Sequence, residues 1–217
     1  MPVLPATWTS HLDEGISYRI GSCTPEGEPQ LVRAVGAQVL PDGRMEVLVA
    51  REPGSAVLQA LEATRQVALA AGRPMTHRTL HVKGQDAERR PAGPEHEALL
   101  VAQREAFAES VRIFGVRREH LAALWYSLSW RDLDAVRFSV AGAWDQTPGP
   151  GAGSSIDLLP GPAPERNVAP ALAPASSPPP VQEQAAHGLG LRDIRRLLEG
   201  VIPPSLCTVS ADGVPHM

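Results

Sequence analysis

Two histidines with metal-ligand spacing, His77 and His81, stand out in the 217-residue chain. On an α-helix the pattern H-x-x-x-H places two imidazoles on one face, where they can hold a metal ion. The segment HRTLHVKG (77–84) reads instead as a β-strand, in which residues four apart are separated by about 13 Å. No glutamate follows His77 as it does in helical zinc-protease motifs. The sequence therefore predicts no metal site here.

The nucleophilic residues form no recognisable constellation. Two cysteines, Cys23 and Cys207, are too few for a disulfide framework or a four-ligand metal site. Cys23 lies in a strand-like run, where a buried cysteine behaves as a small hydrophobe. No Ser–His–Asp or Cys–His pair is suggested by context. Gly188-Leu-Gly190 lacks the third glycine and the preceding strand of a dinucleotide fingerprint. The catalytic residues, if the chain has any, are unknown from sequence.

Composition excludes several classes of partner. The net charge is −4 and Lys83 is the only lysine, which argues against a nucleic-acid-binding surface. No apolar run approaches the ~20 residues that cross a bilayer. The first residues, MPVLPATWTSHLDEG, lack the basic and apolar regions of a signal peptide. We therefore expect a cytoplasmic protein with no nucleic-acid or membrane partner.

Alternating runs separated by turn signals predict an antiparallel sheet with helices, an α+β chain that is mainly β. Pro41-Asp42-Gly43 marks a hairpin between two such runs. Many strands joined by short turns in so few residues favour a closed barrel. The expected strands are 17–23, 30–39, 44–50, 65–71, 77–84 and 134–144, and the expected helices are 56–63, 95–111 and 118–128.

Proline divides the chain. Ten of the 22 prolines lie between Pro148 and Pro180, and proline removes backbone donors and fixes φ. We interpret residues 147–189 as a Pro/Ala/Gly-rich linker that follows a folded domain, residues 1–146. Docking of the short apolar patch SIDLLPG within it on a domain surface is the alternative.

The tail repeats the beginning of the chain at an offset of 186. Ile20, Gly27 and Pro29 correspond in this way to Leu206, Gly213 and Pro215. The alternative is a chance match, since a strand, an Asp-Gly turn and a second strand are a common succession. If the repeat is real, residues 190–217 are the incomplete start of a second domain. Such a fragment cannot bury a core alone, so it would be disordered, pair with a partner or belong to a truncated chain.

Residues 29–84 resemble the pyridoxamine 5′-phosphate oxidase-like family of flavin-binding split β-barrels. A proline opens one strand, an Asp-Gly hairpin leads to an apolar strand, and a helix is followed by RQVAL and by a strand that ends in Lys-Gly. The resemblance extends more weakly over residues 12–144, and the tail resembles the start of another such domain. It implies a split barrel that holds flavin mononucleotide (FMN) between the subunits of a homodimer.

The resemblance implies residues that hold the phosphate of FMN. Arg33 matches a strand arginine of the family, and a guanidinium gives bidentate bonds to phosphate. Ser55 matches the start of a helix whose amides face the anion. The basic pair of the oxidases is absent at Ser55-Ala56, and Arg51 is a substitute. The plainer alternatives are a solvated strand arginine for Arg33 and a helix N-cap for Ser55.

The resemblance also implies residues along the flavin ring. The backbone of Val49 and Ala50 matches the strand that runs along the isoalloxazine. Thr79 and Lys83 match positions of polar flavin contacts, although Lys83 also suits the surface end of a strand.

These assignments indicate an FMN-binding oxidoreductase of unknown substrate. No C-terminal Arg/Trp motif that grips pyridoxal phosphate is found, so a true pyridoxamine phosphate oxidase is not expected. A flavin carries the hydride chemistry itself, which suits a chain without a catalytic constellation. The alternatives are a non-catalytic module that binds flavin, haem or no cofactor and dimerises, and a structural part of a longer two-barrel protein.

Overall fold

The computed structural model of the chain describes residues 1–116, 121, 128–161, 208–209 and 215–216. The helix expected over 118–128 therefore falls mostly outside the described residues.

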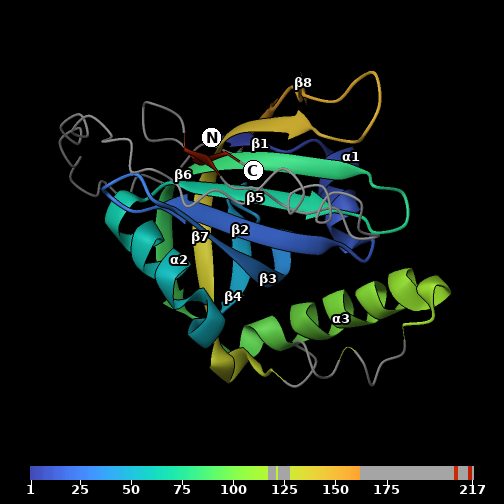
Figure 1. The fold of residues 1–217 in the computed structure, drawn as a ribbon, viewed down its shortest axis with the longest axis horizontal. Coiled ribbons are helices and arrows are strands. Elements are labelled where there is room, and N and C mark those ends of the chain that lie inside the picture. The colour runs from blue at the N-terminus through green and yellow to red at the C-terminus, as the bar shows by residue number, and fades with distance from the viewer. Residues whose placement is uncertain (117–120, 122–127, 162–207, 210–214, 217) are drawn as a thin grey trace, which may run out of the picture.

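Six antiparallel strands close into a barrel (Figure 1). The hydrogen-bonded order is β4-β3-β2-β5-β6-β7, and β4 pairs with β7 to close the cylinder. The expected antiparallel barrel is thus confirmed, with strand ends shifted by a few residues except in β6, which is seven residues longer at its end. The strands are β2 Ser17–Cys23, β3 Pro29–Val39, β4 Met45–Ala50, β5 Val67–Gly72, β6 Thr79–Pro91 and β7 Leu133–Asp145.

Two main helices of the described residues cover the barrel. Helix α2 (Arg51–Thr64) follows β4 directly and buries Val57, Leu58 and Leu61, which are spaced along one of its faces. It contacts β2, β3, β4 and β6. Helix α3 (Glu97–Val111) packs on the outside of β3. Shorter helical segments are α1 Ala6–Thr9, η1 Ser10–Asp13, η2 Pro94–His96, η3 Arg112–Phe114 and η5 Trp130–Asp132.

Strand β4 is buried on both faces because it lies between two cores. Met45, Val47 and Val49 point into the barrel interior. The alternate residues Leu48 and Ala50 face the second core, formed with Leu100 and Phe107 of α3 and other residues. The apolar run from Val47 to Ala50 follows from that double burial.

Part of the expected linker is docked on the barrel. Strand β8 (Ser154–Ser155) pairs with β7, and β9 (Leu159–Pro160) pairs with β1 (Pro2–Val3). Between them, Ile156 and Leu158 pack against the interior core. The patch SIDLLPG therefore docks on the domain surface. The boundaries 1–146, 147–189 and 190–217 stay predictions.

At the other end of the sequence, β10 (Thr208–Val209) and β11 (Pro215–His216) form a small antiparallel pair. In the described part of the chain, no helix combines the length and the hydropathy needed to span a membrane.

Candidate functional site

Strand register places a row of chemically capable side chains across the outside of the barrel. Arg33 of β3 lies opposite Arg19 of β2, and Arg19 lies opposite Ala70 of β5. The row continues to His81 of β6 and to Trp144 of β7. Their neighbours along each strand point into the interior core. Because successive strand residues face opposite sides, these five side chains face outward.

A second outward row runs beside the first and consists largely of small residues. Gly21 lies opposite both Leu31 and Ala68, and Ala68 lies opposite Lys83. Lys83 in turn lies opposite Gly142. Gly21, Ala68 and Ala70 carry no side chain longer than a methyl group, and they lie on the strands between those of Arg33 and Lys83. We call the two rows together the outer face.

The two arginines of the outer face, Arg19 and Arg33, repel each other. Like charges directly opposite on paired strands are destabilising. Burial, and then the positive charge of Arg19, lowers the pKa of Arg33 to about 10. Burial also lowers the pKa of Arg19. The Arg33 guanidinium lies 5.2 Å from the centre of the Phe107 ring of α3, and Arg19 Nη1 donates to Ser17 Oγ at 3.2 Å. An anion placed against this pair would be favoured by both charges.

The opposite side of the outer face carries the indole ring of Trp144 and the imidazole ring of His81. Lys83 Nζ lies 5.5 Å from the centre of the Trp144 ring. Burial lowers the pKa of His81, so its imidazole is neutral near neutral pH. Thr79 lies on the same side of β6, where its Oγ1 donates to the carbonyl of His77 at 2.8 Å. Lys83 would repel a further cation, whereas a flat aromatic ring can pack against Trp144.

The structure separates the other predicted site residues from the outer face. Arg51 at the start of α2 binds Asp134 through Nε at 2.8 Å and donates to the carbonyls of Arg131 and Leu133 at 2.7 and 2.9 Å. These bonds engage three of the five N–H donors of the guanidinium and hold it against the start of β7. Ser55 is exposed in the second turn of α2. Its interpretation as an N-cap is wrong, because α2 begins at Arg51 and the N-cap residue is Ala50.

Val49 and Ala50 offer only backbone to a ligand. The Val49 side chain is fully buried in the barrel interior, and Ala50 is buried beneath α3. Both residues pair with β7, and Val49 also pairs with β3.

His77 and His81 are not arranged to bind one metal ion together. His77 lies in the turn before β6 with φ of 56°, whereas His81 lies within the strand. Among the residues that the structure describes, no group of three or more His, Cys, Asp or Glu side chains is arranged to hold a metal ion.

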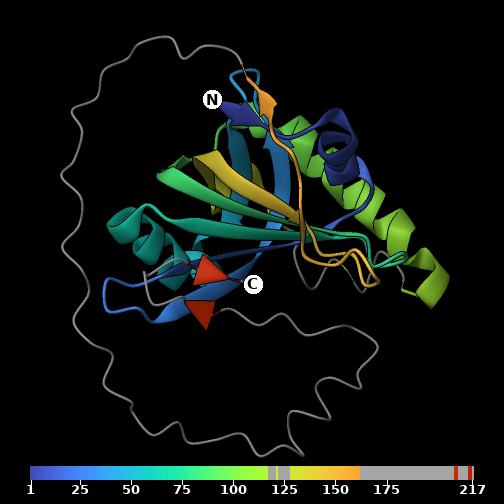
Figure 2. The ribbon, with the colours of Figure 1, turned by 90° about the horizontal axis from the view of Figure 1, so that it is seen from above.

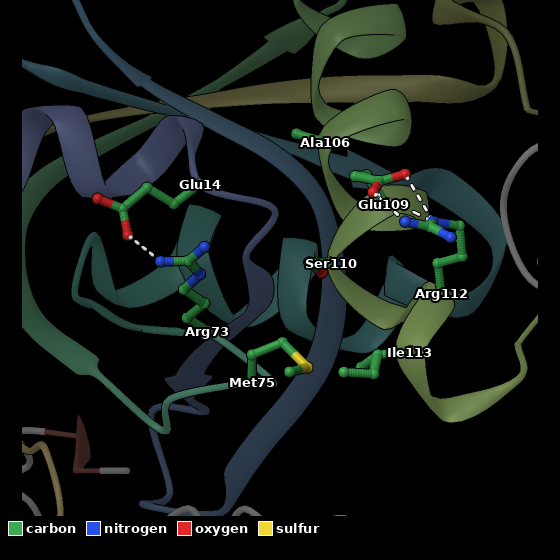
Figure 3. Close-up of a pocket in the computed structure, with 8 residues that line it drawn as sticks. All are labelled: Glu14, Arg73, Met75, Ala106, Glu109, Ser110, Arg112 and Ile113. Carbon is green, nitrogen blue, oxygen red and sulfur yellow. Dashed lines mark hydrogen bonds and ion pairs between the residues drawn. The ribbon is translucent and has the colours of Figure 1, made fainter.

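An open cleft lies between the turn before β6 and the end of α3 (Figure 3). Its volume is ≈ 470 Å³. Its charges are balanced, because Arg73 binds Glu14 at 3.2 Å and Arg112 binds Glu109 at 3.0 Å. The cleft shares no lining residue with the outer face. It is lined by Glu14, Arg73, Met75, Ala106, Glu109, Ser110, Arg112 and Ile113.

Sequence reasoning missed Arg19 as a site residue. The signal was present, because a hairpin that turns at residues 25–27 brings residue 19 opposite residue 33. His81 was considered only as a metal ligand, and its place in the row depends on pairings that a single sequence does not show.

The strand order and the closing pair define a split β-barrel, so the fold implied by the resemblance is confirmed. No protein-family model matches the chain, and no curated protein matches it by sequence. Similar solved structures include HupZ of Group A Streptococcus, at 10% identity and TM-score 0.43, covering 70% of this chain and 100% of that one. An F420 reductase matches at 15% identity and TM-score 0.42, covering 64% and 98% of the two chains. A candidate pyridoxamine 5′-phosphate oxidase from Lactobacillus delbrueckii matches at 13% identity and TM-score 0.41, covering 65% and 93%. The fold assignment rests on this chain's own strand order.

Proposed function

We propose that the chain is an FMN-binding split-barrel protein that acts as an oxidoreductase on a substrate still to be identified. The observation that carries the proposal is the Arg19–Arg33 pair, two half-buried cations held directly opposite each other on the outer face. A phosphate dianion between them would convert a repulsion into two charge-assisted interactions.

The rest of the outer face suits a flat ring. Gly21, Ala68 and Ala70 provide a floor without projecting side chains. Lys83 and Arg33 are three strand spacings apart, which is roughly 14 Å across the sheet. A mononucleotide with its phosphate at Arg33 would bring its ring toward Lys83 and Trp144. When bound, FMN supplies hydride transfer, and the chain's residues bind and orient it.

The proposal includes a homodimer that completes the site from a second copy. It does not include pyridoxamine phosphate oxidation, because the sequence lacks the C-terminal Arg/Trp motif that binds pyridoxal phosphate.

FMN titration of the purified protein tests the proposal. We expect a yellow complex, saturable quenching of flavin fluorescence and reduction of the bound flavin by a nicotinamide donor. A protein that binds FMN but resists reduction would be a non-catalytic flavin module. A Soret band would indicate haem, and a colourless protein that takes up no FMN would contradict the proposal.

Arg33→Ala is expected to weaken FMN binding by about 1.5–3 kcal/mol, or roughly 10- to 150-fold in Kd, because a charge-assisted hydrogen bond to phosphate is lost. Isothermal titration with FMN measures the change. Riboflavin, which has no phosphate, should bind wild type and variant equally. Arg112→Ala is the control, since Arg112 is exposed and pairs with Glu109 on α3. An unchanged Kd for FMN would remove Arg33 from the site.

A further inference from the structure

The small C-terminal hairpin has the strand register of the first hairpin of the barrel. Thr208 pairs with His216, and Val209 pairs with Pro215. At the sequence offset of 186, these four residues correspond to Ser22, Gln30, Cys23 and Pro29. Those residues pair in the same way, Ser22 with Gln30 and Cys23 with Pro29. The C-terminal copy of the repeat therefore pairs in the same strand register as the N-terminal copy.

The hairpin lies against the barrel rather than apart from it. Strand β11 contacts β2 and β5, and Figure 2 shows the pair, in red, on the outside of the barrel. The barrel is closed by β4 and β7, so β2 and β5 have no free edge to which a further strand could add. Contact must therefore be made on a surface of these strands, and their inward side is filled by the core.

The outward side of β2 and β5 has small residues that let another backbone segment approach these strands closely. Gly21 has no side chain, and Ala68 and Ala70 present single methyl groups. Ala68 and Ala70 point away from the interior core yet are only 3% and 7% exposed. The outward side chains directly opposite them, Arg19 and His81 at Ala70 and Lys83 at Ala68, contribute to this burial, and β11 contacts the same two strands.

We propose that the outer face of β2 and β5 is a docking surface for the chain's own C-terminal strand pair, β10 (Thr208–Val209) and β11 (Pro215–His216). Because barrel and hairpin belong to one chain, docking is intramolecular and needs no high protein concentration. A two-stranded hairpin alone is at best marginally stable in water, so the barrel surface stabilises it. The docked strands and a flavin ring would occupy the same surface at Gly21, Ala68 and Ala70, so FMN binding as proposed above would require the hairpin to leave this face.

Hydrogen exchange of the intact chain, without flavin, tests the docking. We expect the amides of Thr208, Val209 and His216 to exchange about tenfold or more slowly than unstructured rates. Ala70→Glu should abolish this protection, because the longer side chain obstructs the face while its carboxylate can pair with Arg19, which lies opposite. Ala68→Gln obstructs the same face without charge and should act alike. Ala56→Glu, at an exposed position of α2, should leave the protection unchanged.

Three results would overturn the proposal. One is exchange of the Thr208, Val209 and His216 amides at unstructured rates in the wild type. Another is protection that survives both Ala70→Glu and Ala68→Gln while the barrel amides stay protected. The third is protection that arises only at concentrations where light scattering shows a doubled mass, since the surface would then receive a second copy. Each result is independent of FMN binding, so failure of the docking is distinguishable from failure of the proposed function.

Discussion

Glu46→Ala is expected to lower the free energy of unfolding by about 3 kcal/mol, because it leaves several cations without their shared carboxylate. Glu46 is 1% exposed on the outward side of β4. Its Oε1 accepts from Gln38 Nε2 at 2.8 Å and lies 3.1 Å from His96 Nε2. Its Oε2 accepts from Arg137 Nε at 2.5 Å and from Arg90 Nη2 at 3.1 Å.

The expected loss is at the lower end of the 3–5 kcal/mol typical for a broken buried pair, because Arg137 and Arg90 are partly exposed and can turn toward water. For a domain of this size it corresponds to a fall of roughly 6–12 °C in Tm. Urea unfolding followed by circular dichroism measures it. Glu88→Ala is the matched control, since this exposed carboxylate pairs with Arg44 and Arg65 at the surface. A loss no larger than that of Glu88→Ala would contradict the prediction.

The contribution of Glu46 should disappear in acid. Burial by itself would raise the pKa of Glu46, but hydrogen bonds from Arg137 and Gln38 and the nearby positive charges lower it below its ordinary value. A folded pKa below the unfolded one stabilises the protein above the unfolded value, near 4.3, and this stabilisation is lost as pH falls through the folded pKa. The gap in unfolding free energy between wild type and Glu46→Gln should therefore narrow between about pH 7 and about pH 3. A gap that stays constant would rule out this charge effect.

Gly84→Ala is expected to cost a comparable amount, about 3 kcal/mol, through overpacking of the barrel interior. Gly84 lies at a register shift of β6 opposite Val67 and Val140, which both belong to the interior core. A Cβ atom there would lie 2.1 Å from Phe138 Cδ2 and 2.7 Å from Val67 Cγ1. Phe138 is fully buried, so its ring has no open space into which to move.

Gly36→Ala is the matched control for this prediction, since Gly36 is also a strand glycine. Its added Cβ would meet Gln103 Cγ at 3.4 Å, which is ordinary contact, so its stability should stay within about 1 kcal/mol of wild type. Combining Gly84→Ala with Phe138→Leu should cost less than the sum of the two changes, because the smaller side chain admits the new methyl group. Strict additivity in thermal unfolding would show that the two residues do not collide.

Local pattern was enough to predict most of the barrel. The strand from Ser17 to Cys23 agrees with its predicted limits, because alternation and turn residues act over a few positions. The start of α2 was misplaced, since Pro53 and Gly54 read as turn residues. Pro53 is tolerated because it lies in the first turn, where its missing amide has no helical partner to lose.

The candidate site was harder to predict, because it depends on contacts between distant residues. The family resemblance singles out Arg33, but its repulsive neighbour depends on hairpin register. Arg51 looked available for a phosphate, and only the position of Asp134, far along the chain, shows that it is engaged. The network around Glu46 likewise joins β4 to His96 and Arg137, which no local pattern connects.

The pairing of β1 with β9 has a consequence for protein engineering. Pro2 lies opposite Pro160, and the amide of Gly161 donates to the carbonyl of Met1 at 2.7 Å. A short peptide bridge between these neighbours would link the two ends of the barrel covalently. New ends could then be opened in the exposed Asp42 turn, which gives a circular permutant with every barrel strand intact.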